Sequence, residues 1–142
     1  MQVQQIMQTA VIFADPEMTI RDVARSMRAD NIGALPVSED GHLIGMVTDR
    51  DIVTRAVAEA RSPGETSVRD VMSQGLCYCY EDDALDEAAE VMAKHQVRRL
   101  PVINRQKQLV GFITLADLGR AEDYAAQEAL KGISEPTDKD RR

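Results

Sequence analysis

The sequence lacks a membrane-length hydrophobic run, a basic cluster and a rich supply of cysteine. No apolar stretch approaches the roughly 20 residues that a membrane-spanning helix needs, and the N-terminus, with Gln2, Gln4 and Gln5, has no basic signal-peptide start. The net charge is −7, and no run of Lys and Arg is longer than two residues, which argues against general affinity for nucleic acid or anionic membranes. These absences predict a soluble, cytoplasmic protein that binds neither nucleic acid nor membrane.

Metal-binding and catalytic patterns are also missing. Cys77 and Cys79 are the only cysteines, and in an extended strand their side chains would point to the same face, so a structural strand pair is favoured. Because His42 and His95 are isolated, no Cys/His set has zinc-ligand spacing. No nucleophile has a histidine base within its motif, so we expect no enzymatic activity. Metal or redox sensing through the two cysteines is the weakest alternative.

A seven-residue motif occurs twice. Residues 45–51 are Gly-Met-Val-Thr-Asp-Arg-Asp, and residues 111–117 are Gly-Phe-Ile-Thr-Leu-Ala-Asp. Each copy reads as the end of a strand followed by the first turn of a helix, where a threonine suits a phosphate and an aspartate can accept hydrogen bonds from both hydroxyls of a ribose. The alternative is a capping box, in which the same side chains satisfy the helix's own donors. Capping is favoured for either copy alone, and the duplication strengthens the case for a binding site.

The duplication covers most of the chain. Pro101 follows Pro36 by 65 residues within two Leu-Pro-Val segments, and Gly111 follows Gly45 by 66, so the second copy has one more residue in a turn. We expect an α/β protein of two βαββα repeats packed about a pseudo-twofold axis as one compact module, because a repeat of about 60 residues is marginal alone. The expected organisation is repeat 1 at residues 6–61, a linker at 62–68, repeat 2 at 69–124, and a helical extension with a mobile polar tail at 125–142.

Apolar periodicity places the elements within each repeat. Residues 20–27 and 85–92 each carry an apolar stripe and predict helices, with Thr19 and Asp83 as N-caps and Asn31 and Val97 at the exits. Strands are expected at 34–38, 43–48, 99–103 and 109–114, with a lead strand at 76–80. A helix is expected at 49–60, where the apolar stripe is Ile52, Val53, Ala56 and Val57. A last helix is expected from Leu118 through Tyr124 and Ala125 to Lys131, and Gly132 would end it. Pro36 and Pro101 inside strands indicate an edge or an unpaired side.

The βαββα duplication, the Leu-Pro-Val strands and the paired Gly-x-Val/Ile-Thr-x-x-Asp motifs together resemble a stand-alone pair of CBS domains, named after cystathionine β-synthase, in its short bacterial form. The resemblance extends over about residues 6–124. It implies a disc-shaped repeat pair, clefts between the repeats that bind AMP, ADP, ATP or S-adenosylmethionine, and association of two discs into a homodimer.

The resemblance also implies the site residues. In each cleft one repeat would supply the aspartate that binds the ribose, and the second repeat would supply much of the surroundings of the base and the phosphate. The first cleft would contain Thr48, Asp51, Gly75, Cys77, Val97, Arg98, Arg99, Leu100 and Pro101, with Arg50 nearby. The second would contain Thr114, Asp117, Ala10, Ile12, Ile32, Gly33, Ala34 and Pro36.

The two expected clefts differ in charge. Arg98 and Arg99 would supply guanidinium donors for phosphate in the first, whereas the second has Gly33 and Ala34 at the corresponding positions. We therefore expect a nucleotide in the first cleft more often, although the arginines could instead be solvated or lie in a dimer interface. The leading hypothesis is a regulatory adenine-nucleotide sensor that signals to a partner protein by conformational change. The main alternative is a dimerisation or docking module with empty clefts.

Overall fold

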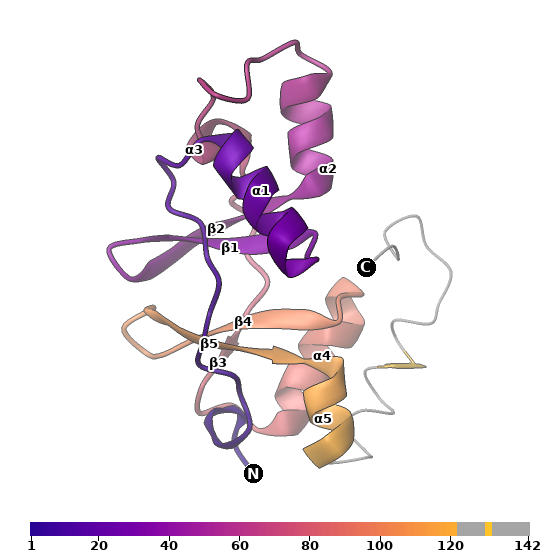
Figure 1. Ribbon diagram of the computed structural model, residues 1–142. Coiled ribbons are helices and arrows are strands. Elements are labelled where there is room, and N and C mark those ends of the chain that lie inside the picture. The colour runs from indigo at the N-terminus through magenta and orange to yellow at the C-terminus, as the bar shows by residue number, and fades with distance from the viewer. Residues whose placement is uncertain (122–129, 132–142) are drawn as a thin grey trace. The chain divides into compact units, whose positions relative to one another are not determined.

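A computed structural model describes residues 1–121, 130 and 131 of the chain (Figure 1). Contacts divide the chain into two units. One unit is Ile12–Leu76, and the other combines Met1–Val11 with the chain from Cys77 onward. Both units mix helices with a small sheet, which confirms the α/β fold class. Within the described part of the chain, no helix combines the length and the apolar character needed to cross a bilayer.

The unit Ile12–Leu76 is a β-hairpin covered by helices. Its elements are α1 (Ile20–Asp30), β1 (Ala34–Glu39), β2 (His42–Thr48), α2 (Asp49–Ile52), the π-helical turn η2 (Val53–Val57) and α3 (Val68–Val71). β1 and β2 are antiparallel, and the turn between them is Asp40-Gly41, with φ of 53° and 83°. Positive φ at both turn residues is the geometry that Asp-Gly favours in a hairpin.

The second unit repeats this plan. It contains η1 (Val3–Gln5), β3 (Cys79–Tyr80), α4 (Leu85–His95), β4 (Arg99–Ile103), β5 (Leu109–Thr114) and α5 (Leu115–Ala121). β4 lies between β3, to which it is parallel, and β5, to which it is antiparallel. In the first unit, Ala14 forms the corresponding parallel bridge to Val37 of β1.

The two repeats exchange their leading segments. Ser73 lies near the start of the second repeat, yet it pairs with Met46 of β2 through two backbone hydrogen bonds of 2.8 and 2.9 Å. Gln8, which lies near the start of the first repeat, pairs with Phe112 of β5 through bonds of the same lengths. Gln8 and Ser73 are 65 residues apart, so they occupy equivalent positions. Each unit is therefore completed by the segment that leads into the other repeat.

The glycine of each motif permits this crossing. A Cβ atom at Gly45 would lie 2.8 Å from the carbonyl oxygen of Ser73, and one at Gly111 would lie 2.7 Å from that of Gln8. Real Cβ atoms do not approach a backbone oxygen so closely, so the strand accepts the crossing segment only where it has no side chain. The glycine that opens each motif is thus explained by packing.

Each unit has its own hydrophobic core, and the exchanged segment contributes to it. Val68, Val71 and Met72 join the cluster beneath α1, while Val3 joins the cluster beneath α4. Burial of such side chains stabilises a fold by about 1.5–3 kcal/mol each, before ordering entropy is subtracted. The apolar stripe of α4 is buried as predicted, but Ala24 of the α1 stripe is exposed.

The predicted caps of α1 are confirmed. The Thr19 hydroxyl accepts a hydrogen bond from the Asp22 N–H at 3.2 Å, and Asn31 ends the helix in the left-handed conformation with φ of 53°. In α4 the left-handed exit residue is Gln96, with φ of 54°, and not Val97 as predicted. The residue that ends α4 is therefore one position earlier in the sequence than predicted.

The prediction of Asp83 as the N-cap of α4 is wrong. The residue at that position is Ala84, whose N–H donates to the Glu87 carboxylate at 3.0 Å. Asp83 instead accepts a hydrogen bond from the Tyr80 N–H at 2.9 Å and so closes the preceding turn. An acidic residue next to a helix start can satisfy either a turn or a cap, and here it satisfies the turn.

The predicted helix at 49–60 is also different. α2 has four α-helical residues, after which η2 continues with the Ala58 N–H donating to the Val53 carbonyl, five residues back. This wider turn rotates the expected stripe, so that Ala56 is buried whereas Val53 and Val57 are 56% and 63% exposed.

Two further elements differ from the expected bounds. The lead strand predicted at 76–80 is regular only in β3, over its last two residues. The last helix is described as α5 to Ala121, and Tyr124, Ala125, Gly132 and the polar tail lie outside the described residues.

Candidate functional site

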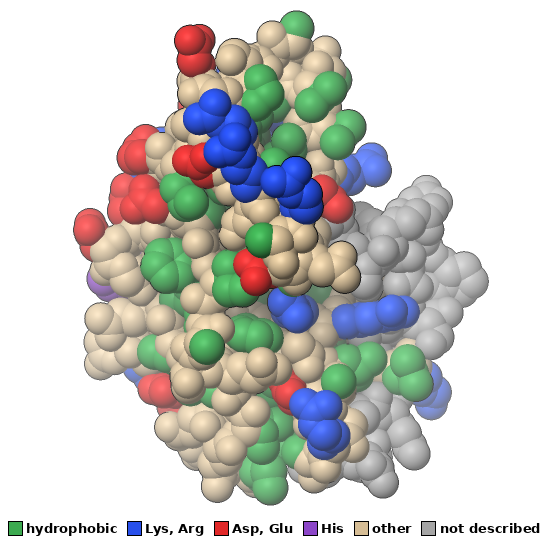
Figure 2. Space-filling model, viewed as in Figure 1, with side chains coloured by type: hydrophobic (Ala, Val, Ile, Leu, Met, Phe, Trp, Pro, Cys, Tyr) green, Lys and Arg blue, Asp and Glu red, His purple; other side chains and the backbone are tan. Residues whose placement is uncertain are grey.

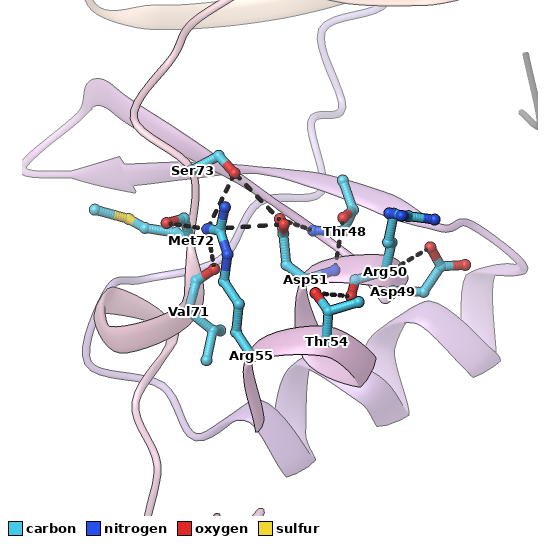
Figure 3. A network of polar contacts seen from close by, with 9 residues as sticks. All are labelled: Thr48, Asp49, Arg50, Asp51, Thr54, Arg55, Val71, Met72 and Ser73. Atoms are coloured by element: carbon cyan, nitrogen blue, oxygen red, sulfur yellow. Dashed lines mark hydrogen bonds and ion pairs between the residues drawn. The ribbon is translucent and has the colours of Figure 1, made fainter. Parts of the chain in front are cut away.

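The first Thr-x-x-Asp motif is a reciprocal cap at the start of α2 (Figure 3). The Thr48 hydroxyl accepts from the Asp51 N–H, and Asp51 Oδ2 accepts from the Thr48 N–H, each at 3.0 Å. The strand end places Thr48 in an extended conformation, and the helix then brings Asp51 back over it. The capping box that the motif also predicted is therefore present, and such a cap stabilises a helix by about 0.5–2 kcal/mol.

The cap uses one oxygen of Asp51, and the other is held weakly (Figure 3). Oδ1 accepts from the Ser73 hydroxyl at 3.4 Å and lies 3.8 Å from Arg55 Nη1. That same Nη1 is closer to two carbonyl oxygens at the end of α3, 2.9 Å from Val71 and 3.1 Å from Met72. Asp51 is buried, and Oδ1 is the carboxylate oxygen with unused capacity to accept hydrogen bonds.

The second motif repeats the cap with a stronger hold on the acid. The Thr114 hydroxyl accepts from the Asp117 N–H at 3.1 Å, and Asp117 Oδ2 accepts from the Thr114 N–H at 2.9 Å. Gln8 donates to both carboxylate oxygens, at 3.2 and 3.4 Å, and Arg120 lies 2.5 Å from Oδ1. Gln8 thus takes the role that Ser73 has in the first unit, and Asp117 has less remaining acceptor capacity than Asp51.

Four of these partners were not predicted from the sequence. Ser73 and Gln8 were not among the predicted site residues, although their 65-residue spacing indicates that they are equivalent. Arg55 follows its aspartate by four residues and Arg120 by three, which are spacings that bring side chains together on a helix.

The predicted phosphate arginines have contacts within their own unit. The Arg99 guanidinium lies 4.9 Å from the centre of the Phe112 ring, a cation–π contact. The Arg98 carbonyl accepts from the Leu115 N–H at 2.8 Å and so holds the start of α5. Arg50 is exposed, and its guanidinium points away from Asp51 (Figure 3). All three arginines are exposed.

The remaining predicted residues are divided between the two units. Pro36 does not lie on an unpaired side as predicted, because its carbonyl accepts a hydrogen bond from the Ala14 N–H at 2.9 Å and β2 pairs with β1 on the other side. The unit Ile12–Leu76 contains Ile12, Ile32, Gly33, Ala34, Pro36, Thr48, Arg50, Asp51 and Gly75. The other unit contains Ala10, Cys77, Val97, Arg98, Arg99, Leu100, Pro101, Thr114 and Asp117. Their assembly into two clefts stays a prediction.

Both cysteines are free thiols, Cys79 buried and Cys77 half-buried. Burial raises the pKa of Cys77 to about 11 and that of Cys79 to about 12, so both are protonated at neutral pH. A thiolate is the form that binds zinc or attacks a disulfide. Over residues 1–121, 130 and 131, no three His, Cys, Asp or Glu side chains gather into a set that could hold a metal ion.

Comparison with known proteins shows the family to which the chain belongs. The family model of the CBS domain matches the chain twice, over residues 3–58 and 68–123. The chain belongs to the CBS domain family. CBS domain-containing protein YhcV of Bacillus subtilis is 42% identical over 134 residues, which are 93% of this chain and 94% of that protein. Hypoxic response protein 1 of Mycobacterium tuberculosis is 35% identical over 133 residues, 92% of each.

Solved structures of CBS domain pairs share the fold. A crystal structure of Hypoxic Response Protein I with two coordinated zinc ions has a TM-score of 0.75 and 36% identity, and the match covers 84% of this chain and 98% of that one. The CBS domain pair of protein MJ0100 in complex with 5′-methylthioadenosine and S-adenosyl-L-methionine has a TM-score of 0.69 and 26% identity, covering 87% and 97%. Both ligands of that second protein contain adenosine.

Proposed function

We propose that this CBS domain pair is a regulatory protein of the cytoplasm that binds an adenosine compound and changes its interaction with a partner protein. The ligand class is AMP, ADP or ATP, with S-adenosylmethionine as the alternative, and the protein acts as a homodimer without catalysing a reaction. The adenosine ligands of the MJ0100 CBS pair support the ligand class. The observation that carries the proposal is the buried Asp51, whose Oδ1 keeps capacity to accept hydrogen bonds.

Asp51 suits the diol of a ribose. The Thr48 N–H fixes the carboxylate through Oδ2, so Oδ1 is oriented before a ligand arrives. A hydrogen bond to a charged group contributes about 1.5–3 kcal/mol, and a micromolar ligand needs about 8 kcal/mol in total. Two ribose hydroxyls would therefore supply a substantial part of the affinity, and base stacking and phosphate contacts would supply the rest.

The two acids are not equivalent in this proposal. Asp117 accepts from Gln8 and is paired with Arg120, so a ligand would have to displace closer partners than at Asp51. We therefore propose Asp51 as the principal ribose acceptor, with Arg98 and Arg99 of the other repeat supplying positive charge for phosphate, as the family resemblance implies. The preference for the first motif thus rests on hydrogen bonding as well as on charge.

The contacts of Asp51 also suggest how binding would be transmitted. A ribose hydroxyl that takes Oδ1 competes with the Ser73 hydroxyl and with Arg55. Arg55 holds the carbonyls of Val71 and Met72 in the segment that leads into the second repeat. A ligand that favours one arrangement of this segment would shift the protein between two states.

The docking-module alternative has an observation of its own. Both aspartates are satisfied by capping without any ligand, so the motifs would be stable if the clefts were empty. In that case the capping geometry shared by the two motifs would serve only to start α2 and α5, and the protein would act through its surface.

Titration with AMP, ADP, ATP and S-adenosylmethionine, by thermal shift and then by calorimetry, separates the two functions. The sharpest variant is Asp51→Asn, because its amide oxygen can still accept from the Thr48 N–H while its NH2 group cannot accept from a diol. We expect Asp51→Asn to weaken binding about tenfold or more, which corresponds to about 1.4 kcal/mol. The matched variant Asp117→Asn should have a smaller effect. Equal affinity for wild type and Asp51→Asn would remove Asp51 from the site, and no binding of any of the four compounds would favour the docking module.

A further inference from the structure

One equivalent position carries different side chains beside the motif aspartates of the two units. The residue is Ser73 in the unit Ile12–Leu76 and Gln8 in the other unit, 65 residues apart. The backbone is fixed in the same way at both, because its N–H and its C=O each bond to the strand that leads into the motif, at 2.8 and 2.9 Å. The difference between the two positions is therefore the side chain, and each side chain contacts the aspartate of its own unit.

The serine side chain leaves one oxygen of Asp51 open (Figure 3). The Ser73 hydroxyl contacts Oδ1 alone, at a long distance of 3.4 Å, and it also accepts from Arg55 Nη1 at 3.3 Å. The Asp51 side chain is 13% exposed. A ligand hydroxyl that approaches Oδ1 therefore has to displace only one long hydrogen bond from this serine.

The glutamine side chain lies across both oxygens of Asp117. Gln8 Nε2 donates to Oδ2 at 3.2 Å and to Oδ1 at 3.4 Å. The Asp117 side chain is 6% exposed, about half the value for Asp51. Because a ribose diol would also donate to both oxygens of a carboxylate, it can bind Asp117 only after the Gln8 side chain has moved away.

The neighbouring arginines are common to both motifs. Arg55 Nη1 lies 3.8 Å from Asp51 Oδ1, and its side chain is 49% exposed. Arg120 Nη2 lies 2.5 Å from Asp117 Oδ1, and its side chain is 70% exposed. Ion pairs of exposed side chains contribute little, since water competes for both partners. The side chain at the fixed backbone position is therefore the difference between the motifs that a ligand would meet first.

We propose that the residue at positions 8 and 73 determines whether the motif aspartate is available to a ribose diol. Serine leaves the acid available and glutamine closes it. This residue is a positioning residue, because it acts on the ligand through the aspartate. The inference rests on the proposed function, in which Asp51 binds an adenosine compound, and it adds the side chain that selects between the two motifs.

Substitution of Ser73 in two directions tests this role by calorimetry with AMP. Ser73→Gln should weaken AMP binding about tenfold, because the diol must displace an amide that donates to both oxygens. Ser73→Ala should bind AMP as tightly as wild type or about twofold more tightly, because Oδ1 loses a competitor. A purely structural role of Ser73 would instead weaken binding in both variants.

The reciprocal substitution should open the second motif. In Asp51→Asn the first motif has lost its ribose acceptor, so binding in this background reports on Asp117. Gln8→Ser/Asp51→Asn should bind AMP about tenfold more tightly than Asp51→Asn alone. Ser73→Gln/Asp51→Asn should differ from Asp51→Asn by less than about twofold, because residue 73 acts through Asp51.

The comparisons keep the charge of the protein constant. Figure 2 shows Lys and Arg side chains on the surface over α1, where Arg21, Arg25 and Arg28 are exposed. General attraction of the anionic AMP by such arginines is the same in wild type and Ser73→Gln, so it cannot cause a difference between them. The matched control is Ser62→Gln, which makes the same chemical change at an exposed serine of the same unit and should leave AMP affinity unchanged.

The outcomes separate this inference from the proposed function. Circular dichroism of every variant checks that the helices are intact. Equal AMP affinity of wild type and Ser73→Gln, equal weakening by Ser73→Ala and Ser73→Gln, or no gain from Gln8→Ser in the Asp51→Asn background overturns the inference alone. A wild type that binds none of AMP, ADP, ATP and S-adenosylmethionine overturns the proposed function, and the inference with it.

Discussion

The crossing of each exchanged segment over a motif glycine leads to a specific prediction about stability. In Gly45→Ala the new Cβ would lie 2.8 Å from the Ser73 carbonyl oxygen and 3.1 Å from the Met72 sulfur. The sulfur can move, but the carbonyl oxygen accepts from the Met46 N–H at 2.9 Å and can move only by weakening that bond. The substitution therefore acts on the segment that connects one repeat to the next.

The expected loss follows from two opposing effects. Overpacking a well-packed site costs about 1–3 kcal/mol, while replacing Gly with Ala recovers about 0.4–1 kcal/mol because the unfolded chain becomes less flexible. With the midpoints of these ranges, about 2 and about 0.7 kcal/mol, the free energy of unfolding falls by about 1.3 kcal/mol, or about 3–6 °C in Tm for a chain of this size. Gly111→Ala should lose at least as much, because its Cβ would lie 2.7 Å from the Gln8 carbonyl oxygen and 2.8 Å from the Met7 sulfur.

Urea denaturation and thermal melting of Gly45→Ala and Gly75→Ala give a matched comparison. A Cβ at Gly75 would have no neighbour within 4 Å, so Gly75→Ala should change stability by no more than about 0.5 kcal/mol. Hydrogen exchange should also be faster at the Met46 and Ser73 amides of Gly45→Ala, where the crossing is strained. Equal stability of the two variants, with unchanged exchange at these amides, would refute the role assigned to the motif glycine.

Two predictions concern pH. Because burial raises the pKa of Cys77 to about 11 and of Cys79 to about 12, while an unfolded thiol titrates at about 8.5, the free energy of unfolding should fall as the pH rises above about 8.5. The double variant Cys77→Ala/Cys79→Ala should show a flatter alkaline profile in urea denaturation, and identical profiles would contradict this. Arg105 donates two hydrogen bonds to Asp82, at 2.7 and 3.1 Å, and holds the pKa of that carboxyl below its usual range. The pair therefore stabilises the fold above pH about 4, and this stabilisation is lost as the pH falls through the lowered pKa. In Arg105→Gln the pKa of Asp82, followed by NMR, should rise toward the ordinary value of an aspartate carboxyl, and an unchanged pKa would show that another group lowers it.

Local periodicity predicted much of the fold. The stripes of α1 and α4, the hairpin strands and the Thr19 cap depend on residues that are neighbours in sequence, so the pattern contains the information. β4 and β5 lie at the predicted residues. The exposure of Val53 and Val57 could not be predicted in this way, because the wider turn of η2 breaks the helical period on which the expectation rested.

The exchange of leading segments could not be predicted from local sequence patterns. The 65-residue offset shows that Gln8 and Ser73 are equivalent, but equivalence does not tell which hairpin each one joins. The motif predicted the cap between Thr48 and Asp51 because both residues lie within one turn of helix. It did not predict the contact of Asp51 with Ser73, which is 22 residues away in the sequence. Contacts over short sequence separations are set by local geometry, whereas contacts over long separations depend on the folded arrangement of the whole unit.

The most direct test of the proposed function is a crystal structure of the protein with bound AMP. We predict that both ribose hydroxyls lie within hydrogen-bond distance of Asp51, with Oδ1 released from Ser73 and Arg55 and Oδ2 still accepting from the Thr48 N–H. A nucleotide bound elsewhere, with the Asp51 contacts to Ser73 and Arg55 unchanged, would contradict the assignment of this carboxylate as the ribose acceptor.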